Sequence, residues 1–225
     1  MSEQVVTKII DYISIFLALL LVIPVHEFAH AFAAVKSGDN TPKINGRLTL
    51  NPLAHFDLLG LCCFVLAGIG WSKPVPVNPY NYKHLRRDSF FVAISGVVAN
   101  YILAFLFYPL FIVALLYIPR FYYFTDVLSQ ALFYVYRLSL VFFVFNLIPI
   151  YPLDGFMVVD AFNRKHGFIY RFLRNQARYV LLVLFALGVV ADYTGIYQMD
   201  ILGIAINFIV GWIGKPITLF WGLIF

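Results

Sequence analysis

The sequence predicts an all-α polytopic membrane protein with about five to six transmembrane helices. Of its 225 residues, 62% are hydrophobic and 12% are charged, which is about half the charged fraction of a soluble domain. The mean hydropathy is +0.86, and the apolar residues form long runs instead of alternating faces. These observations exclude a water-soluble enzyme, a disordered chain and a disulfide scaffold. They predict a single integral-membrane domain over residues 1–225.

The spanning helices are predicted from the apolar runs of the chain. A helix that crosses a bilayer needs about 20 mainly apolar residues. The first run continues to Val35, which makes it longer than the apolar core of a signal peptide, so we expect it to be retained. The candidate spans are residues 10–35, 90–118, 127–153, 177–191 and 200–222.

A sixth apolar stretch, residues 52–72, is broken by Asp57 and three glycines and is predicted to be a re-entrant, membrane-embedded segment. The basic residues are the reason, because 12 of the 16 fall in the connectors 36–50 and 73–88 and in residues 164–178. The positive-inside rule places all three groups in the cytoplasm, so residues 52–72 begin and end on one side. Residues 44–50 alternate loosely in polarity, which indicates either a short β-strand able to pair with an extended peptide or an ordinary connector.

Residues 26–30 read His26-Glu27-Phe28-Ala29-His30, an HExxH pattern inside the first predicted span. Positions i and i+4 share one face of a helix, so both imidazoles can bind one Zn²⁺ with Glu27 beside its water. The chain contains only two Glu and five His, and random placement would give about 0.001 such matches. The alternative is a polar patch that joins neighbouring helices.

A catalytic zinc needs a third protein ligand, and the candidates are His55, His84, His166 and the aspartates. His84 and His166 fall in basic connectors and are expected to be solvated. Asp154 ends the apolar run 127–153. In the predicted topology this span crosses the membrane in the same direction as the span 10–35. Asp154 is therefore expected to meet the HExxH near the cytoplasmic side. His30 then lies about 8 Å inside the end of its helix. The alternative for Asp154 is an interfacial residue before a turn glycine.

The paired motifs resemble the site-2 protease family of intramembrane zinc metalloproteases. The resemblance rests on the HExxH and on Asn146-Leu-Ile-Pro-Ile-Tyr-Pro-Leu-Asp154-Gly155, and it extends through Gly46–His55 and Trp71–Pro79 to cover roughly residues 20–160. It implies hydrolysis of peptide bonds in or beside transmembrane segments of membrane-protein substrates. It also implies one Zn²⁺ per chain, bound by His26, His30 and Asp154, with Glu27 as the catalytic base.

Two positions depart from the family pattern. The third-span motif Gly-Pro-x-x-Asn reads Gly96-Val-Val-Ala-Asn100 here, without the proline, and the residue after Leu-Asp-Gly is the large Phe156. We place the catalytic core at about residues 10–155 and the C-terminal helices at about 177–222.

Several roles stay open at this level. Asn146 or Asn100 donates a hydrogen bond to the developing oxyanion or joins helices, and His55 either holds the transition state or caps the re-entrant turn. The same polar residues would also suit an ion or metal transporter, or a catalytically idle scaffold. The expected partners are a transmembrane protein substrate and the lipid bilayer, and no nucleic acid, with the oligomeric state left open. The expected location is a prokaryotic cell membrane, with the active site toward the cytoplasm.

Overall fold

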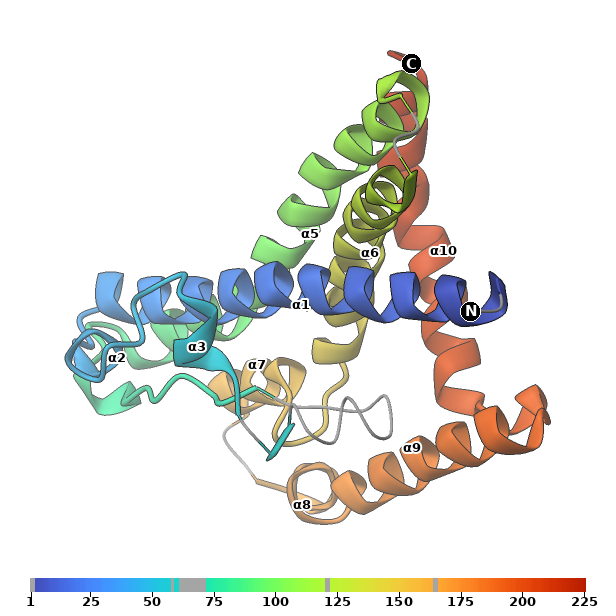
Figure 1. Ribbon diagram of the computed structural model, residues 1–225. Helices are drawn as coiled ribbons and strands as arrows, with labels where there is room; N and C mark the ends of the chain where they lie inside the picture. The colour runs from blue at the N-terminus through green and yellow to red at the C-terminus, as the bar shows by residue number, and fades with distance from the viewer. Residues whose placement is uncertain (1–2, 58, 61–71, 120–121, 164–165) are drawn as a thin grey trace.

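Figure 1 shows the computed structural model, which describes the chain except residues 1–2, 58, 61–71, 120–121 and 164–165. Five of the described helices are long and apolar enough to cross a membrane. They are α1 (Glu3–Lys36), α5 (Leu85–Tyr117), α6 (Tyr122–Asn146), α9 (Ala177–Thr194) and α10 (Ile201–Gly222). The predicted all-α polytopic fold is confirmed, and each predicted span overlaps one of these helices.

Helices α1, α5 and α6 pack together and form the part of the fold that carries the site. In Figure 1, α1 lies across α5 and α6. Their shared core contains Ala18 and Val22 of α1, Leu103 of α5 and Val135 of α6, all buried. Ala18 is fully buried at this crossing, and small residues let membrane helices approach closely.

Helix α10 extends this core on the other side. It packs against α5 and α6 through Ala104, Leu140 and Ile217, which are all buried. The indole Nε1 of Trp221 also donates a hydrogen bond of 3.0 Å to the carbonyl of Phe105. A short 3₁₀ helix, η2 (Tyr197–Met199), joins α9 to α10. Most large apolar side chains on α9 and α10 are exposed, as expected for helices that face lipid.

The third span is shorter than predicted, and the expectation that Asp154 ends it is wrong. Helix α6 ends at Asn146, residues 147–153 form turns, and Asp154 is the first residue of α7 (Asp154–Phe162). Pro149 and Pro152 explain the difference, because proline lacks an N–H donor and disfavours helical geometry in the residue before it. Helix α8 (Phe168–Asn175) follows α7.

The connector between α1 and α5 contains α2 (Thr41–Ile44), α3 (Pro52–His55) and a 3₁₀ turn, η1 (Pro79–Asn81). Its two halves are tied together by Asp39, whose side chain is fully buried. Asp39 accepts hydrogen bonds from the N–H and hydroxyl of Thr41, from the N–H of Asn78 and from the amide of Asn81. Burial would raise the pKa of Asp39, but these hydrogen bonds outweigh it and lower the pKa below the ordinary value.

The short β-strand considered near residues 44–50 is not formed. Residues 41–44 are helical, with Pro42 in the first turn, and residues 45–51 form turns and loop. Most of the predicted re-entrant segment 52–72 lies outside the described residues. Its described ends are side by side, since Phe56 and Ser72 form an isolated antiparallel bridge and the N–H of Lys73 donates to the His55 carbonyl at 2.8 Å.

The three basic connectors gather at one end of the helix bundle. The N–H of Lys83 donates to the carbonyl of Ser37 at 3.0 Å, which joins the end of α1 to the segment before α5. The rings of Phe90 and Phe162 lie 5.5 Å apart, which joins the start of α5 to the end of α7.

Candidate metal centre

The structure brings together His26, His30 and Asp154, and their ligand atoms form a small triangle. The two Nε2 atoms lie 3.1 Å apart, and each lies 3.3 Å from Asp154 Oδ2. Three ligands of a tetrahedral zinc at about 2.0–2.1 Å would be separated by about 3.3–3.4 Å. The three residues are buried, with exposed fractions of only 6–9%. The triangle therefore has the dimensions of a zinc site.

The donor chemistry also fits a cation. His30 Nδ1 lies 2.7 Å from the carbonyl of Val92, which only accepts hydrogen bonds, so Nδ1 carries the proton and Nε2 presents its lone pair to the triangle. Asp154 contributes a carboxylate oxygen that faces the same point. Lone pairs that converge in a buried site are satisfied when a cation binds between them.

The local sequence explains how each ligand reaches the triangle. His26 and His30 are one helical turn apart on α1, and α1 ends six residues after His30, a distance of about 9 Å along the axis. Asp154 starts α7, which must return close to the end of α6. A Cβ atom at Gly155 would lie 2.6 Å from the backbone carbon of Leu147, so only glycine allows this close return.

Helix α5 supplies the supporting shell of the site. Besides the Val92 carbonyl, it places the amide nitrogen Nδ2 of Asn100 at 3.0 Å from His26 Nδ1. A rotation of this amide by half a turn exchanges the positions of its NH₂ and C=O groups. When His26 binds metal through Nε2, its Nδ1 carries the proton and needs an acceptor, so the C=O group of Asn100 faces it. As placed, Asn100 Oδ1 is buried and has no hydrogen-bond partner among the described residues, which favours the same choice. Asn100 therefore orients His26.

Gly96 lies one turn before Asn100 on the same helix and provides the space for the histidines. A Cβ atom there would lie 2.6 Å from His26 Cε1 and 2.8 Å from His26 Nδ1, and it would also overlap His30 Nε2. The two residues that match the third-span motif, Gly96 and Asn100, thus serve the two histidines in different ways. The missing proline of that motif does not prevent α5 from forming one continuous helix.

Glu27 is buried beside the triangle and is held by the segment that follows residue 71. Its Oε1 accepts a hydrogen bond of 2.7 Å from the Ser72 hydroxyl, and its Oε2 accepts one of 3.2 Å from the N–H of Val75. These contacts link the HExxH to residues more than 40 positions later in the chain. Ser72 was not among the residues that the sequence singled out for the site, although it belongs to the Trp71–Pro79 segment of the family resemblance.

His55 supports this same segment and is not part of the triangle. Its Nε2 lies 2.8 Å from the carbonyl of Thr49, and the ring is fully buried within the 47–56 loop. Arg47 is also buried and donates to the carbonyls of Ala54 and Lys73. Both residues thus stabilise the loop next to Ser72. This arrangement favours the capping role for His55 over contact with a transition state.

The remaining candidates do not contribute a ligand atom to the triangle. The amide of Asn146 donates a hydrogen bond of 3.1 Å to the Phe142 carbonyl at the end of α6, so it is engaged in its own helix. His84 and His166 are exposed, as predicted for residues of the basic connectors. Within the part of the chain that the structure describes, His26, His30 and Asp154 are the one group of three metal-ligating side chains that meets.

Comparison with known proteins supports a metal-dependent peptidase. The chain is 40% identical over 145 residues to "Putative zinc metalloprotease YwhC" of Bacillus subtilis (strain 168), a match that covers 64% of this chain and 66% of that protein. It is 31% identical over 162 residues to "Putative zinc metalloprotease Rip2" of Mycolicibacterium smegmatis, covering 67% of this chain and 59% of that protein. The chain is thus a homologue of proteins named as zinc metalloproteases.

Both matches span less than two thirds of the relatives' own length. No family model matches the chain. No solved structure matches it either. The family resemblance therefore rests on these two relatives and on the motifs themselves.

Proposed function

We propose that the chain is an intramembrane zinc endopeptidase of the site-2 protease type, which hydrolyses peptide bonds in or near transmembrane segments of membrane proteins. The observation that carries the proposal is the buried triangle of His26, His30 and Asp154, with Glu27 next to His26 on the same spanning helix. The names of the two relatives support the same reaction class. An ion-conducting role would not require ligand spacing that matches zinc or a carboxylate beside it.

In this proposal, His26, His30 and Asp154 hold one Zn²⁺ per chain through Nε2, Nε2 and a carboxylate oxygen. When bound, zinc supplies a Lewis acid that activates a water molecule and polarises the scissile carbonyl. Three protein ligands leave one coordination position open, as a catalytic site requires.

Glu27 is the general base of the proposed reaction. Its carboxylate accepts the proton of the attacking water and passes it to the leaving amine. Hydrogen bonds from Ser72 and Val75 fix both carboxylate oxygens, so that Glu27 cannot rotate freely. A carboxylate held in this way keeps one orientation toward the substrate, which is the basis of the proximity contribution to catalysis.

The proposed substrate is a transmembrane protein, because His26, Glu27 and His30 lie on a helix that is long and apolar enough to span a membrane. His30 is six residues from the end of α1, at the end of the bundle where the three basic connectors gather. The positive-inside rule would place this end in the cytoplasm of a prokaryotic cell. Water and the substrate peptide would then reach the triangle from the cytoplasmic side.

The test uses the purified full chain reconstituted with membrane vesicles that carry a natural mixture of membrane proteins. New N-termini are identified by mass spectrometry for the wild type, for Glu27→Gln, and for the wild type with a zinc chelator. We expect cleavage sites in or beside apolar segments of about 20 residues with the wild type alone. Glu27→Gln is expected to lower the rate at least about 100-fold while zinc content is unchanged. An identical set of cleavage sites with Glu27→Gln would contradict the proposed base.

A further inference from the structure

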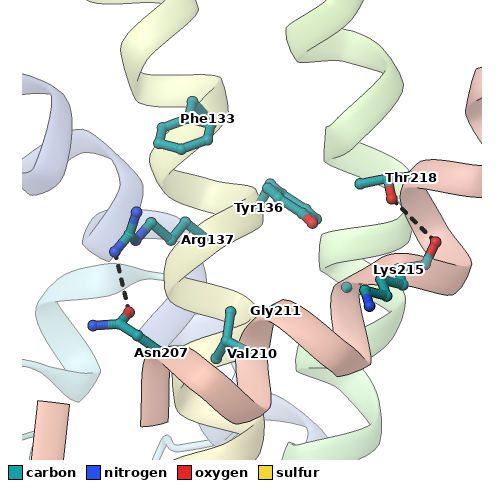
Figure 2. A pocket seen from close by; sticks show the side chains of 9 residues that line it. Phe133, Tyr136, Arg137, Asn207, Val210, Gly211, Lys215 and Thr218 are labelled. Atoms are coloured by element: carbon teal, nitrogen blue, oxygen red, sulfur yellow. Dashed lines mark hydrogen bonds between the residues drawn. The ribbon is translucent and has the colours of Figure 1, made fainter. Parts of the chain in front are cut away.

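A pocket between α6 and α10, which contains none of the residues of the metal centre, is lined by positive and hydrogen-bond-donating groups (Figure 2). Its volume is about 360 Å³. Arg137 of α6 and Lys215 of α10 provide the charges, and Gly211 and Gly214 hollow the α10 face. The other lining residues are Phe133, Tyr136, Asn207, Val210 and Thr218.

The two cations lie unusually deep in their helices. Arg137 is nine residues from the end of α6, and Lys215 is seven residues from the end of α10. All other basic residues in the five spanning helices lie within five residues of a helix end. A charge at this depth in a bilayer is unfavourable unless it is paired, and such residues mark functional sites by default.

Neither cation has a carboxylate partner in the part of the chain that the structure describes. Arg137 donates one hydrogen bond of 3.1 Å to Asn207 Oδ1, and Lys215 Nζ lies 3.8 Å above the ring of Trp212. Both side chains are exposed on the outer surface of the bundle, where a membrane would place lipid. Further donor groups of the site are also unused, since the NH₂ of Asn207 and the hydroxyl of Tyr136 make no hydrogen bond among the described residues. The pocket therefore offers positive charge and free donors to an anion.

We propose that this pocket binds the phosphate group of an anionic phospholipid, with Arg137 and Lys215 as the charged ligands. Asn207 is six residues into α10, about 9 Å from its start, so Arg137 reaches toward the membrane surface at that level, as long basic side chains do. Phe133 and Val210 supply apolar walls for the adjoining acyl chains. Basic pockets between transmembrane helices are suited to lipid headgroups.

A second copy of the chain is a poorer occupant of the pocket. Helix α10 contains no acidic residue, and the acidic residue of α6, Asp126, is 11 positions, about 16 Å, from Arg137. Two copies that met through these faces would bring like charges together. A lipid phosphate supplies the missing negative charge and is present throughout the membrane.

The test is lipid binding by the purified full chain in nanodiscs of phosphatidylcholine, with or without phosphatidylglycerol. Retained lipid is counted by native mass spectrometry, and the unfolding midpoint is measured in parallel. We expect the wild type to retain phosphatidylglycerol selectively and to be stabilised by it. Arg137→Gln and Lys215→Gln should each weaken this binding about fivefold, whereas the control Arg178→Gln, which removes an exposed charge outside the pocket, should not.

A second pair of variants keeps the charges of Arg137 and Lys215 and tests the volume of the pocket. A Cβ atom at Gly211 meets no other atom within 4 Å, so Gly211→Leu is expected to fold and to fill the pocket, and Gly222→Leu is the matched control in equally open space. Gly211→Leu should lose lipid selectivity, and Gly222→Leu should keep it. Equal phosphatidylglycerol retention by wild type, Arg137→Gln and Gly211→Leu would overturn the proposal.

Two further outcomes would reassign the ligand. Inorganic phosphate that stabilises the protein as well as phosphatidylglycerol does would show a soluble anion site in place of a lipid site. A photoreactive side chain at position 211 that crosslinks to protein and not to lipid would identify a partner helix as the occupant. None of these measurements depends on peptidase activity, so the lipid site and the proposed reaction can fail separately.

Discussion

Gly96 makes the packing of α5 against the metal centre testable with one added methyl group. The Cβ atom of Gly96→Ala would lie 2.6 Å from His26 Cε1 and would overlap His30 Nε2. Ordinary contact between such atoms begins at about 3.5 Å, so the histidines or α5 must move by about 1 Å. Metal–ligand distances tolerate only about 0.2 Å, and a 1 Å misplacement of reacting groups can cost about 100-fold in rate. Overpacking should also destabilise the fold by about 1–3 kcal/mol.

The assay for Gly96→Ala is zinc affinity by chelator competition, followed by cleavage of a substrate identified with the wild type. We expect zinc binding at least about tenfold weaker and a marked loss of activity. The control is Gly222→Ala in α10, where the added methyl group meets open space and both quantities should stay at the wild-type level. Wild-type zinc affinity in a well-folded Gly96→Ala would refute the close packing of α5 against the two histidines.

Two other substitutions probe the surroundings of the site. Asn100→Leu should weaken zinc binding about 10–100-fold. Asn100→Asp should weaken zinc binding less, because it keeps an acceptor for His26 Nδ1–H. Equal losses of zinc affinity in both variants would exclude this hydrogen bond. Asp39 has a lowered pKa in the folded protein, so its stabilising effect is present above the ordinary carboxylate pKa of about 3.9 and is lost as pH falls through the folded value. The unfolding midpoint of the wild type should exceed that of Asp39→Asn at neutral pH, and this difference in midpoint should disappear at acidic pH. A difference in midpoint that does not depend on pH would contradict an ionised Asp39.

Much of the fold follows from the sequence, because length and apolarity suffice to identify a spanning helix. The five spans and the pairing of His26 and His30 required no tertiary information. The end of α6 was predicted too late, since the apolar run continues to residue 153 while Pro149 and Pro152 make the backbone turn after Asn146. Hydropathy records lipid solubility and is insensitive to the prolines that end the helix.

The supporting contacts of the site were harder to predict than its ligands. Ligands are recognised by residue type and spacing, which the HExxH displays within five positions. The contacts of Glu27 with Ser72 and of His30 with the Val92 carbonyl join residues 45 and 62 positions apart, and one of them uses a backbone group that any residue would supply. Asn100 was noted in the sequence, but its neighbour His26 is known only from the packing of α5 on α1.

The most direct test of the metal centre is the zinc content of purified protein, compared between the wild type and Asp154→Ala. The two histidines and Asp154 come from segments over 120 residues apart, and the structure joins them at 3.3 Å. We predict close to one zinc per chain in the wild type and a marked loss in Asp154→Ala, with both proteins folded. A well-folded wild type that binds no zinc after reconstitution, or an Asp154→Ala variant that binds it equally well, would contradict the assignment of this triangle as the metal site.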